Sequence, residues 1–250
     1  MGFLSKLGLG LGIGSTSRGV SRPIQESNRS RTFGLPPIAA GPTRPSENRE
    51  TSRISNGLKE FLWNLDGLGR GTLLDLGPAW QTTLGFFIER GFRVSSEDIL
   101  RAWKTFLAEE ETRLQEPGAI LDSLDMTPNG RAARFLESNL QYSASSFDAV
   151  LLWDLLDYLE PALGRQVVTT LTDFLRPGGV VFAMFHSKKP EGFQRYRVAD
   201  SNTLQLISTP PLCPAQKVFQ NREIQELFSR FRTMKSFVSR DQLRETLFIK

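Results

Sequence analysis

The feature that most constrains this sequence is a set of short apolar runs in which polar residues do not alternate. The clearest runs are residues 71–77, 149–154 and 180–185. A strand with one solvated face alternates apolar and polar side chains, whereas a strand covered on both faces does not. These runs therefore predict strands inside a sheet that has helices on both faces.

Segments with helical periodicity separate these runs. Apolar residues recur at helical spacing after Ser55, which is a good N-cap, over residues 82–90, which end at Gly91, and over 99–114. The same spacing returns after Pro161 and after Asn221. Alternating strands and helices indicate a mostly parallel sheet, with a ligand site beyond its carboxyl edge. We expect its other strands at residues 92–98, 135–140, 233–238 and 243–249.

Charge divides the chain into two parts. Residues 1–57 carry eight basic and three acidic side chains, a net charge of +5, within a total of +4. Residues 1–54 are also rich in Gly, Ser, Pro and Arg and show no periodicity, which predicts a disordered basic tail before one domain over residues 55–250. Because the basic excess belongs to the tail, nucleic-acid binding is not expected of the domain.

The scarcity of Cys and His excludes several classes of site. The chain has one cysteine, Cys213, and one histidine, His186, so neither an internal disulfide nor a Cys- or His-rich metal site can form. No apolar run is long enough to span a membrane, and the N-terminal residues lack a clear signal-peptide cleavage site. We expect a cytoplasmic protein without a membrane span or a metal; the sequence does not indicate its oligomeric state.

Several motifs, taken in order, resemble one family. Leu73-Leu74-Asp75-Leu76-Gly77, a helix, the segment from Gly91 to Val94, and then Asp98 resemble the first βαβ unit of class I S-adenosylmethionine-dependent methyltransferases. Residues 146–154 resemble the fourth strand of that family, residues 175–181 the turn into its fifth, and the last two strands its closing hairpin. The resemblance covers roughly residues 58–250. It implies a Rossmann-like α/β fold, with a mostly parallel seven-stranded sheet, a C-terminal antiparallel strand pair, and S-adenosylmethionine as cofactor.

The resemblance also implies where the cofactor binds. Asp98 takes the place of the acidic residue that accepts hydrogen bonds from the ribose hydroxyls, with Glu97 as the alternative one residue earlier. The first loop, which approaches the methionine part, and the ends of two later strands supply the other candidates. The implied cofactor-binding residues are Asp75, Gly77, Ala79, Asp98, Asn139 and Asp154; no metal ligand is implied.

The first loop departs from the family pattern. That pattern is an acidic residue followed by three alternating glycines, but here Ala79 and Gln81 stand at the second and third glycine positions. Glycine lets a backbone approach a ligand closely, and Pro78 removes a backbone donor. Two hypotheses follow: a methyltransferase acting on an unidentified small-molecule or macromolecular acceptor, or a catalytically inactive methyltransferase-like interaction domain. A nicotinamide-dependent oxidoreductase is a third, although its G-x-G-x-x-G fingerprint is absent.

Other polar residues are weighed for a role toward the acceptor. His186, just after a predicted strand, is a candidate general base near neutral pH, with a satisfied or surface histidine as the alternative. A cluster of cations could recognise an anionic acceptor or form an ordinary solvated surface: Lys188, Lys189, Arg195 and Arg197. Trp80 and Trp153 are candidates to line the site, although buried packing is the favoured interpretation for Trp153. Cys213 is expected to be inert.

Overall fold

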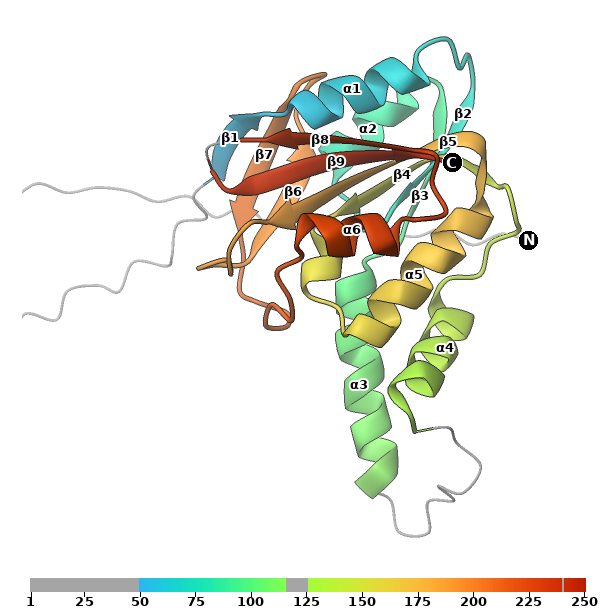
Figure 1. The fold of residues 1–250 in the computed structure, drawn as a ribbon, viewed down its shortest axis with the longest axis vertical. Helices are drawn as coiled ribbons and strands as arrows, with labels where there is room; N and C mark the ends of the chain where they lie inside the picture. The colour runs from blue at the N-terminus through green and yellow to red at the C-terminus, as the bar shows by residue number, and fades with distance from the viewer. Residues whose placement is uncertain (1–49, 116–125, 240) are drawn as a thin grey trace, which may run out of the picture. The chain divides into compact units, whose positions relative to one another are not determined.

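The computed structural model describes residues 50–115, 126–239 and 241–250. The tail predicted for residues 1–54 therefore lies outside the described residues up to position 49. Within the described part of the chain, one large sheet has six strands in the order β3-β2-β4-β5-β9-β8 (Figure 1). The strands are β2 (Gly71–Asp75), β3 (Phe92–Ser96), β4 (Phe147–Trp153), β5 (Leu175–His186), β8 (Thr233–Val238) and β9 (Leu243–Ile249).

The direction of these strands confirms the predicted fold class. β2 is parallel to both β3 and β4, and β4 is parallel to β5. β9 then runs antiparallel to β5, and β8 antiparallel to β9. The fold is Rossmann-like, with the C-terminal antiparallel pair that the methyltransferase resemblance implied.

The strand predicted at residues 135–140 is wrong, and the described sheet is one strand shorter than expected. Those residues lie at the end of α4 (Pro128–Asn139). Thr127 caps this helix by accepting a hydrogen bond from the Gly130 amide at 3.1 Å, and Pro128 stands at its first position. Ala132, Phe135 and Leu136 are buried at helical spacing. The residues that signal the start of this helix, Thr127 and Pro128, lie outside residues 135–140, where a strand was expected.

Helices cover both faces of the large sheet (Figure 1). The helices α1 (Asn56–Leu65) and α2 (Gln81–Ile88) pack with strand residues such as Leu73 and Phe182 in one buried cluster. On the other face, neighbouring residues such as Leu74 and Ala183 join a second cluster. Four helices form that layer: α3 (Ile99–Gln115), α4, α5 (Pro161–Phe174) and α6 (Asn221–Leu227). Strands buried on both faces explain the uninterrupted apolar runs.

A second, antiparallel sheet has the order β1-β7-β6. Its strands are β1 (Glu50–Ile54), β6 (Gln194–Val198) and β7 (Thr203–Ser208). β1 falls within the segment assigned to the tail, so regular structure begins before the expected position at Ser55. β6 and β7 fall within residues 187–220, for which no motif was recognised. Val198 and Leu204 pack the small sheet against the buried cluster that includes residues of α1 and α2.

Candidate functional site

The candidate site lies at the carboxyl ends of β2, β3 and β4. After β2, the chain forms α2 and pairs β3 on one side, while β4 pairs on the other side. The strand order therefore reverses between β2 and β4, and this position is a topological switch point. In open α/β sheets, ligands bind outside the carboxyl ends of strands at such a point. Three of the predicted residues come together here: Asp75, Gly77 and Asp98.

Asp75 ends β2 and is almost completely buried. Its Oδ1 accepts hydrogen bonds from the Gly77 amide at 2.9 Å and from Trp153 Nε1 at 2.6 Å. Its Oδ2 is buried and has no hydrogen-bond partner. Burial raises the pKa of Asp75 to about 6, although the two hydrogen bonds act in the opposite direction. A buried carboxylate with an unsatisfied oxygen is costly, so this environment favours a proton or another hydrogen-bond donor at Oδ2.

Gly77 is required by the close approach of Trp153. A Cβ added at Gly77 would lie 2.8 Å from Trp153 Nε1 and 2.9 Å from Trp153 Cδ1. Trp153 itself has a positive φ of 54°, which is rare for a bulky side chain. Trp153 is 5% exposed, so its indole lines the site and also fills part of it. The glycine that the sequence singled out therefore makes room for a side chain of this protein.

Asp98 follows β3 and is engaged by an arginine from the small sheet. Arg195 Nη2 lies 3.0 Å from Asp98 Oδ1 and 3.3 Å from Asp98 Oδ2. Arg101 adds a longer contact of 3.5 Å. The alternative acceptor, Glu97, instead accepts a hydrogen bond from the Tyr142 hydroxyl at 2.7 Å. Asp98 thus faces the site and Glu97 is used elsewhere, but a guanidinium already occupies the Asp98 carboxylate.

Two other predicted residues do not join this group. Ala79 is exposed in the loop before α2, and Gln81 is the exposed first residue of that helix. Asn139 lies at the end of α4, where its side-chain amide donates to the Phe135 carbonyl at 3.0 Å. Asn139 was expected at the end of a strand, but in the structure it is the last residue of a helix.

Asp154 belongs to a buried cluster of ionisable side chains beside the cleft. The Tyr196 hydroxyl donates to Asp154 Oδ2 at 3.1 Å, and His186 Nδ1 lies 3.9 Å from the same oxygen. Burial, opposed by the charge of His186 and reinforced by Asp157, raises the pKa of Asp154 to about 7. Sequence patterns did not single out Tyr196 or Asp157, because their hydrogen-bond partners, Asp154 and His186, lie 42 and 29 residues away along the chain.

His186 forms a dyad with Asp157. Asp157 Oδ2 lies 2.8 Å from His186 Nδ1 and accepts the His186 backbone amide at 2.7 Å. Burial lowers the pKa of His186, but the hydrogen bond with Asp157 and the nearby carboxylates outweigh it and raise the pKa. The ring borders an open hollow of about 300 Å³ that Lys188 and Lys189 also line. An oriented imidazole beside a hollow could exchange a proton with a ligand there.

The cleft between these groups is nearly filled. Its volume is about 10 Å³, and its walls include Gly77, Trp153, Asp154, Arg195 and Tyr196. That is room for about one water molecule, whereas sites for cofactors and similar ligands usually measure several hundred cubic ångströms. The acidic residues suit a ribose and an ammonium group, but S-adenosylmethionine does not fit between the side chains in this conformation.

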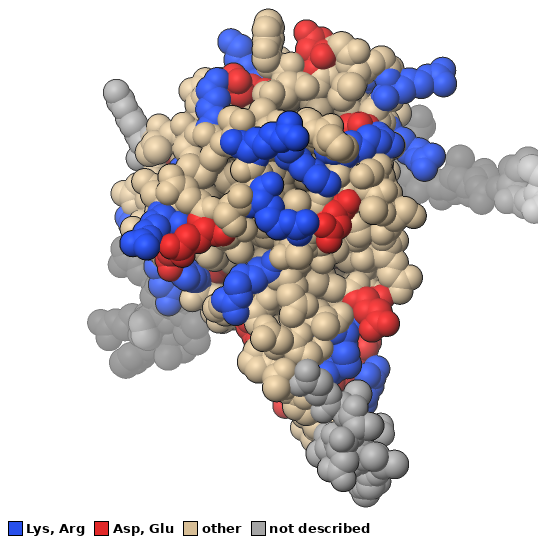
Figure 2. All heavy atoms as spheres, turned by 45° about the vertical axis from the view of Figure 1, so that its right-hand side comes forward, with Lys and Arg blue, Asp and Glu red and all other residues tan. Residues whose placement is uncertain are grey.

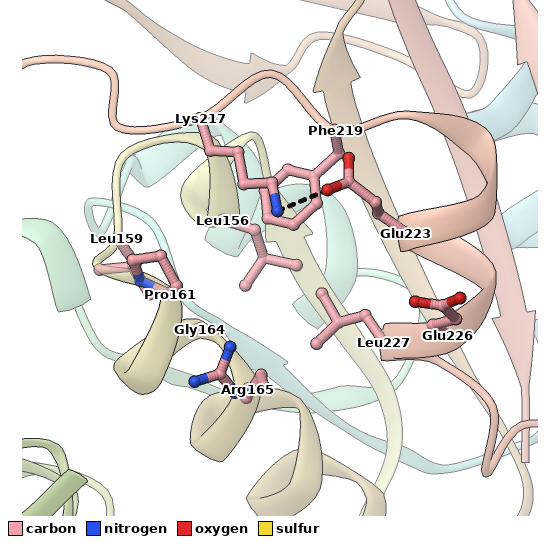
Figure 3. A pocket seen from close by; sticks show the side chains of 10 residues that line it. All are labelled: Leu156, Leu159, Pro161, Gly164, Arg165, Lys217, Phe219, Glu223, Glu226 and Leu227. Carbon is pink, nitrogen blue, oxygen red and sulfur yellow. Dashed lines mark ion pairs between the residues drawn. The ribbon is translucent and has the colours of Figure 1, made fainter. Parts of the chain in front are cut away.

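A larger hollow of about 230 Å³ lies between α5 and α6 (Figure 3). Its floor is apolar, with Leu156, Phe219 and Leu227, and its rim carries an ion pair of 2.7 Å between Lys217 and Glu223. None of the predicted cofactor residues lines it. Elsewhere, the face drawn in Figure 2 carries basic side chains with acidic ones interspersed.

Within residues 50–115, 126–239 and 241–250, no group of three or more His, Cys, Asp or Glu side chains is placed to hold a metal ion. None of the helices described over the same ranges is long and apolar enough to cross a membrane.

Solved structures with a similar fold are methyltransferases, at low similarity. The 1,6-didemethyltoxoflavin-N1-methyltransferase of Burkholderia thailandensis is 16% identical, with a TM-score of 0.41, over 78% of this chain and 79% of its own. A SAM-dependent methyltransferase from Aquifex aeolicus is 11% identical, with a TM-score of 0.40, over 78% and 90% of the two chains. A putative type 11 methyltransferase from Sulfolobus solfataricus is 15% identical, with a TM-score of 0.39, over 76% and 89%.

Comparison by sequence gave nothing further: no protein-family model and no curated protein matches this chain. Structural likeness at these values carries no conclusion about activity. The fold rests on the strand order, and the site rests on the contacts of Asp75, Asp98 and Arg195.

Proposed function

We propose that this chain is a methyltransferase that binds S-adenosylmethionine at the carboxyl edge between β2 and β4. The methyl group of S-adenosylmethionine would pass to a small-molecule or macromolecular acceptor. The fold supports this proposal, because its parallel strands and C-terminal antiparallel pair give the architecture that the resemblance implied.

One observation carries the proposal: Asp75 and Asp98 lie at the ends of neighbouring strands at the switch point, beside the cleft that Gly77 and Arg195 line. Their strands are neighbours, and the Glu97 amide bonds to the Asp75 carbonyl at 2.8 Å, which fixes the start of the Asp98 segment beside Asp75. The negative charge of Asp98 contributes to raising the pKa of Asp75, so the two carboxylates interact electrostatically. An acidic residue at this place in a Rossmann-like fold accepts hydrogen bonds from ribose hydroxyls.

The test is calorimetric titration of the full chain with S-adenosylhomocysteine. We expect saturable binding that weakens at least tenfold in Asp98→Ala, because a charged acceptor of two hydroxyls is lost (about 1.5–3 kcal/mol for each charged hydrogen bond). Asp66→Ala is the matched control, since Asp66 is an exposed residue at the end of α1. Circular dichroism would establish that each variant is folded.

The proposal fails if neither the wild-type protein nor Arg195→Ala, which lacks the guanidinium in the cleft, binds S-adenosylhomocysteine at millimolar concentration. Unchanged affinity in Asp98→Ala would instead place the ligand elsewhere on the protein.

The filled cleft favours a second candidate, a catalytically inactive methyltransferase-like interaction domain. In that case Arg195 and Trp153 are permanent substitutes for a ligand, and the loop with Ala79 and Gln81 has no cofactor to approach. The same titration separates the two candidates, because an inactive domain with a permanently filled cleft binds no S-adenosylhomocysteine in either form.

A further inference from the structure

The feature that the proposed function does not explain is the pair of contacts made by two consecutive residues of β6. Arg195 reaches Asp98, and Tyr196 reaches Asp154, so one strand binds two acidic residues, one beside the cleft and one in its wall. Both β6 side chains are buried, at 9% and 3% exposure. We call these two contacts the β6 clasp.

We propose that the β6 clasp is a reversible closure of a nucleoside-binding cleft, in which the Arg195 guanidinium holds the Asp98 carboxylate until a ligand with vicinal hydroxyls displaces it. This inference rests on the proposed function and adds to it a device that controls access. Its ligand class is a nucleoside with an intact ribose.

The chemistry of the contact supports competition for one acceptor. A guanidinium presents two N–H donors in a plane to a carboxylate, and Arg195 Nη2 lies within 3.3 Å of both Asp98 oxygens. Two neighbouring ribose hydroxyls present two O–H donors to the same oxygens. The two partners exclude each other, because the cleft holds about 10 Å³ while Arg195 and Tyr196 line it.

The attachment of β6 allows it to move without disturbing the large sheet. β6 pairs with β7 and, among the described residues, has no strand on its other side. It is held to α2 by a hydrogen bond of 3.0 Å from the Val198 amide to Thr83 Oγ1. A displacement of β6 therefore breaks this hydrogen bond and part of the buried packing of Val198, but it leaves every ladder of the large sheet intact.

The guanidinium has a second neighbour, Phe193, which remains available when the contact with Asp98 is broken. The Arg195 guanidinium carbon lies 5.1 Å from the centroid of the Phe193 ring, within the range of a cation–π contact. Tyr196 stacks on Trp153 with ring centroids 6.0 Å apart and planes 11° from parallel. Opening therefore requires the Tyr196–Trp153 stack to slide, and this links Arg195 to the indole that donates to Asp75.

The experiment compares S-adenosylhomocysteine binding by the full-length wild type, Arg195→Ala and Arg197→Ala. Arg197 is the matched control, because it loses the same charge from the same strand and its Nε bonds to Gln205 Oε1 at 2.6 Å. We expect Arg195→Ala to bind at least tenfold more tightly than either. Tyr196→Phe keeps the ring on Trp153 but frees Asp154, and should give a smaller gain.

Two further variants protect the test against misfolding and against unspecific effects. Arg195→Gln removes the charge but keeps a polar side chain beside Asp98, so it should show the same gain if Arg195→Ala proves unstable. Adding Asp98→Ala to Arg195→Ala should abolish the gain. In Arg195→Ala, adenosine should bind more tightly than 2′,3′-dideoxyadenosine, because only adenosine offers the hydroxyls to Asp98.

The outcomes separate the clasp from the proposed function. Equal, measurable affinity in the wild type, Arg195→Ala and Arg195→Gln would overturn the clasp and leave the cofactor site standing. No binding in any of them would overturn both, and the cleft would then be a permanently filled part of the core. Equal gains in Arg195→Ala and Arg197→Ala would point to overall charge and also overturn the clasp.

Discussion

At the residue scale, the two oxygens of Asp75 have different surroundings. Oδ1 accepts two hydrogen bonds, from Gly77 and Trp153, while the buried Oδ2 accepts none. Because burial dominates, the folded protein holds the Asp75 proton more tightly than the unfolded chain, with a pKa of about 6 against 3.8. The stability that this provides is fully present below pH 3.8 and is lost as the pH rises through about 6.

Asp75→Asn should remove this pH dependence while keeping an oxygen that accepts from Gly77 and Trp153. We expect the free energy of unfolding of the variant, relative to the wild type, to rise by about 1 kcal/mol between about pH 5 and about pH 7.5. Urea unfolding at the two pH values measures it. A constant difference between variant and wild type would show that Asp75 is not the titrating group. Asp154, whose pKa is also raised, stays in both proteins and cancels.

At the scale of elements, α1 shows how one helix is fixed at both its start and its face. Ser55 accepts a hydrogen bond from the Leu58 amide at 2.9 Å, and the Gly57 amide donates to Glu245 Oε2 at 2.6 Å. A Cβ at Gly57 would lie 2.7 Å from both Glu245 Cβ and a ring carbon of Phe182. The helix therefore lies against β5 and β9 more closely than any side chain at this position would permit.

Gly57→Ala should destabilise the protein by about 1–3 kcal/mol, because the buried neighbours must shift. Gly85→Ala is the matched control, since Gly85 is also helical but has nothing within 4 Å of the added carbon. That control should stabilise the protein by about 0.5–1 kcal/mol through helix propensity. Thermal or denaturant unfolding of both variants measures the contrast, and similar values for both would contradict the close approach.

The sequence predicted elements well where local signals coincide with burial. The cap at Ser55, the turn at Gly91 and the helix after Pro161 are confirmed, and β8 and β9 begin and end where expected. The error at residues 135–140 came from a short segment of mixed polarity. Such a segment does not distinguish a strand from a helix when the start signals at Thr127 and Pro128 are overlooked.

The candidate site was predicted only in part, for a physical reason. Asp75, Gly77 and Asp98 could be placed by their positions after predicted strands. The partners that decide the state of the cleft come from β6 and from the end of β4, about 80 to 100 residues away from them along the chain. Periodicity reports which face of an element is buried, but it does not report which distant arginine meets a given carboxylate.

At the scale of the whole domain, a buried ion pair joins the two sheets. Arg53 of β1 lies 2.8 Å from Glu245 Oε1 of β9, and Glu245 is 2% exposed. Burial raises the pKa of Glu245, although the Gly57 amide and Arg53 act in the opposite direction. β1, within the segment predicted to be a tail, is therefore part of the structure that positions β7 and, through it, β6.

Arg53→Met should destabilise the protein by about 3 kcal/mol, because it leaves the buried Glu245 charge without its partner. The double variant Arg53→Met/Glu245→Gln should recover much of that loss, since glutamine is neutral and still accepts from Gly57. A chain that starts at Glu50 should keep the stability of the full chain, whereas one that starts at Ser55 should lose at least as much as Arg53→Met. Denaturant unfolding compares the four variants with the full chain, and equal stability of the two truncated chains would contradict the role of β1.

The position of β9 within the large sheet has a consequence for biosynthesis. β5 ends at His186, but β9, which pairs with its residues from Val180 to His186, begins only at Leu243. During translation at roughly 5–20 residues per second, the edge of β5 on the nascent chain stays unpaired for several seconds until β9 leaves the ribosome. An unpaired strand edge is a template for association with other chains. Yield in the cell should therefore depend on translation speed through residues 187–242 and on chaperones that shield that edge.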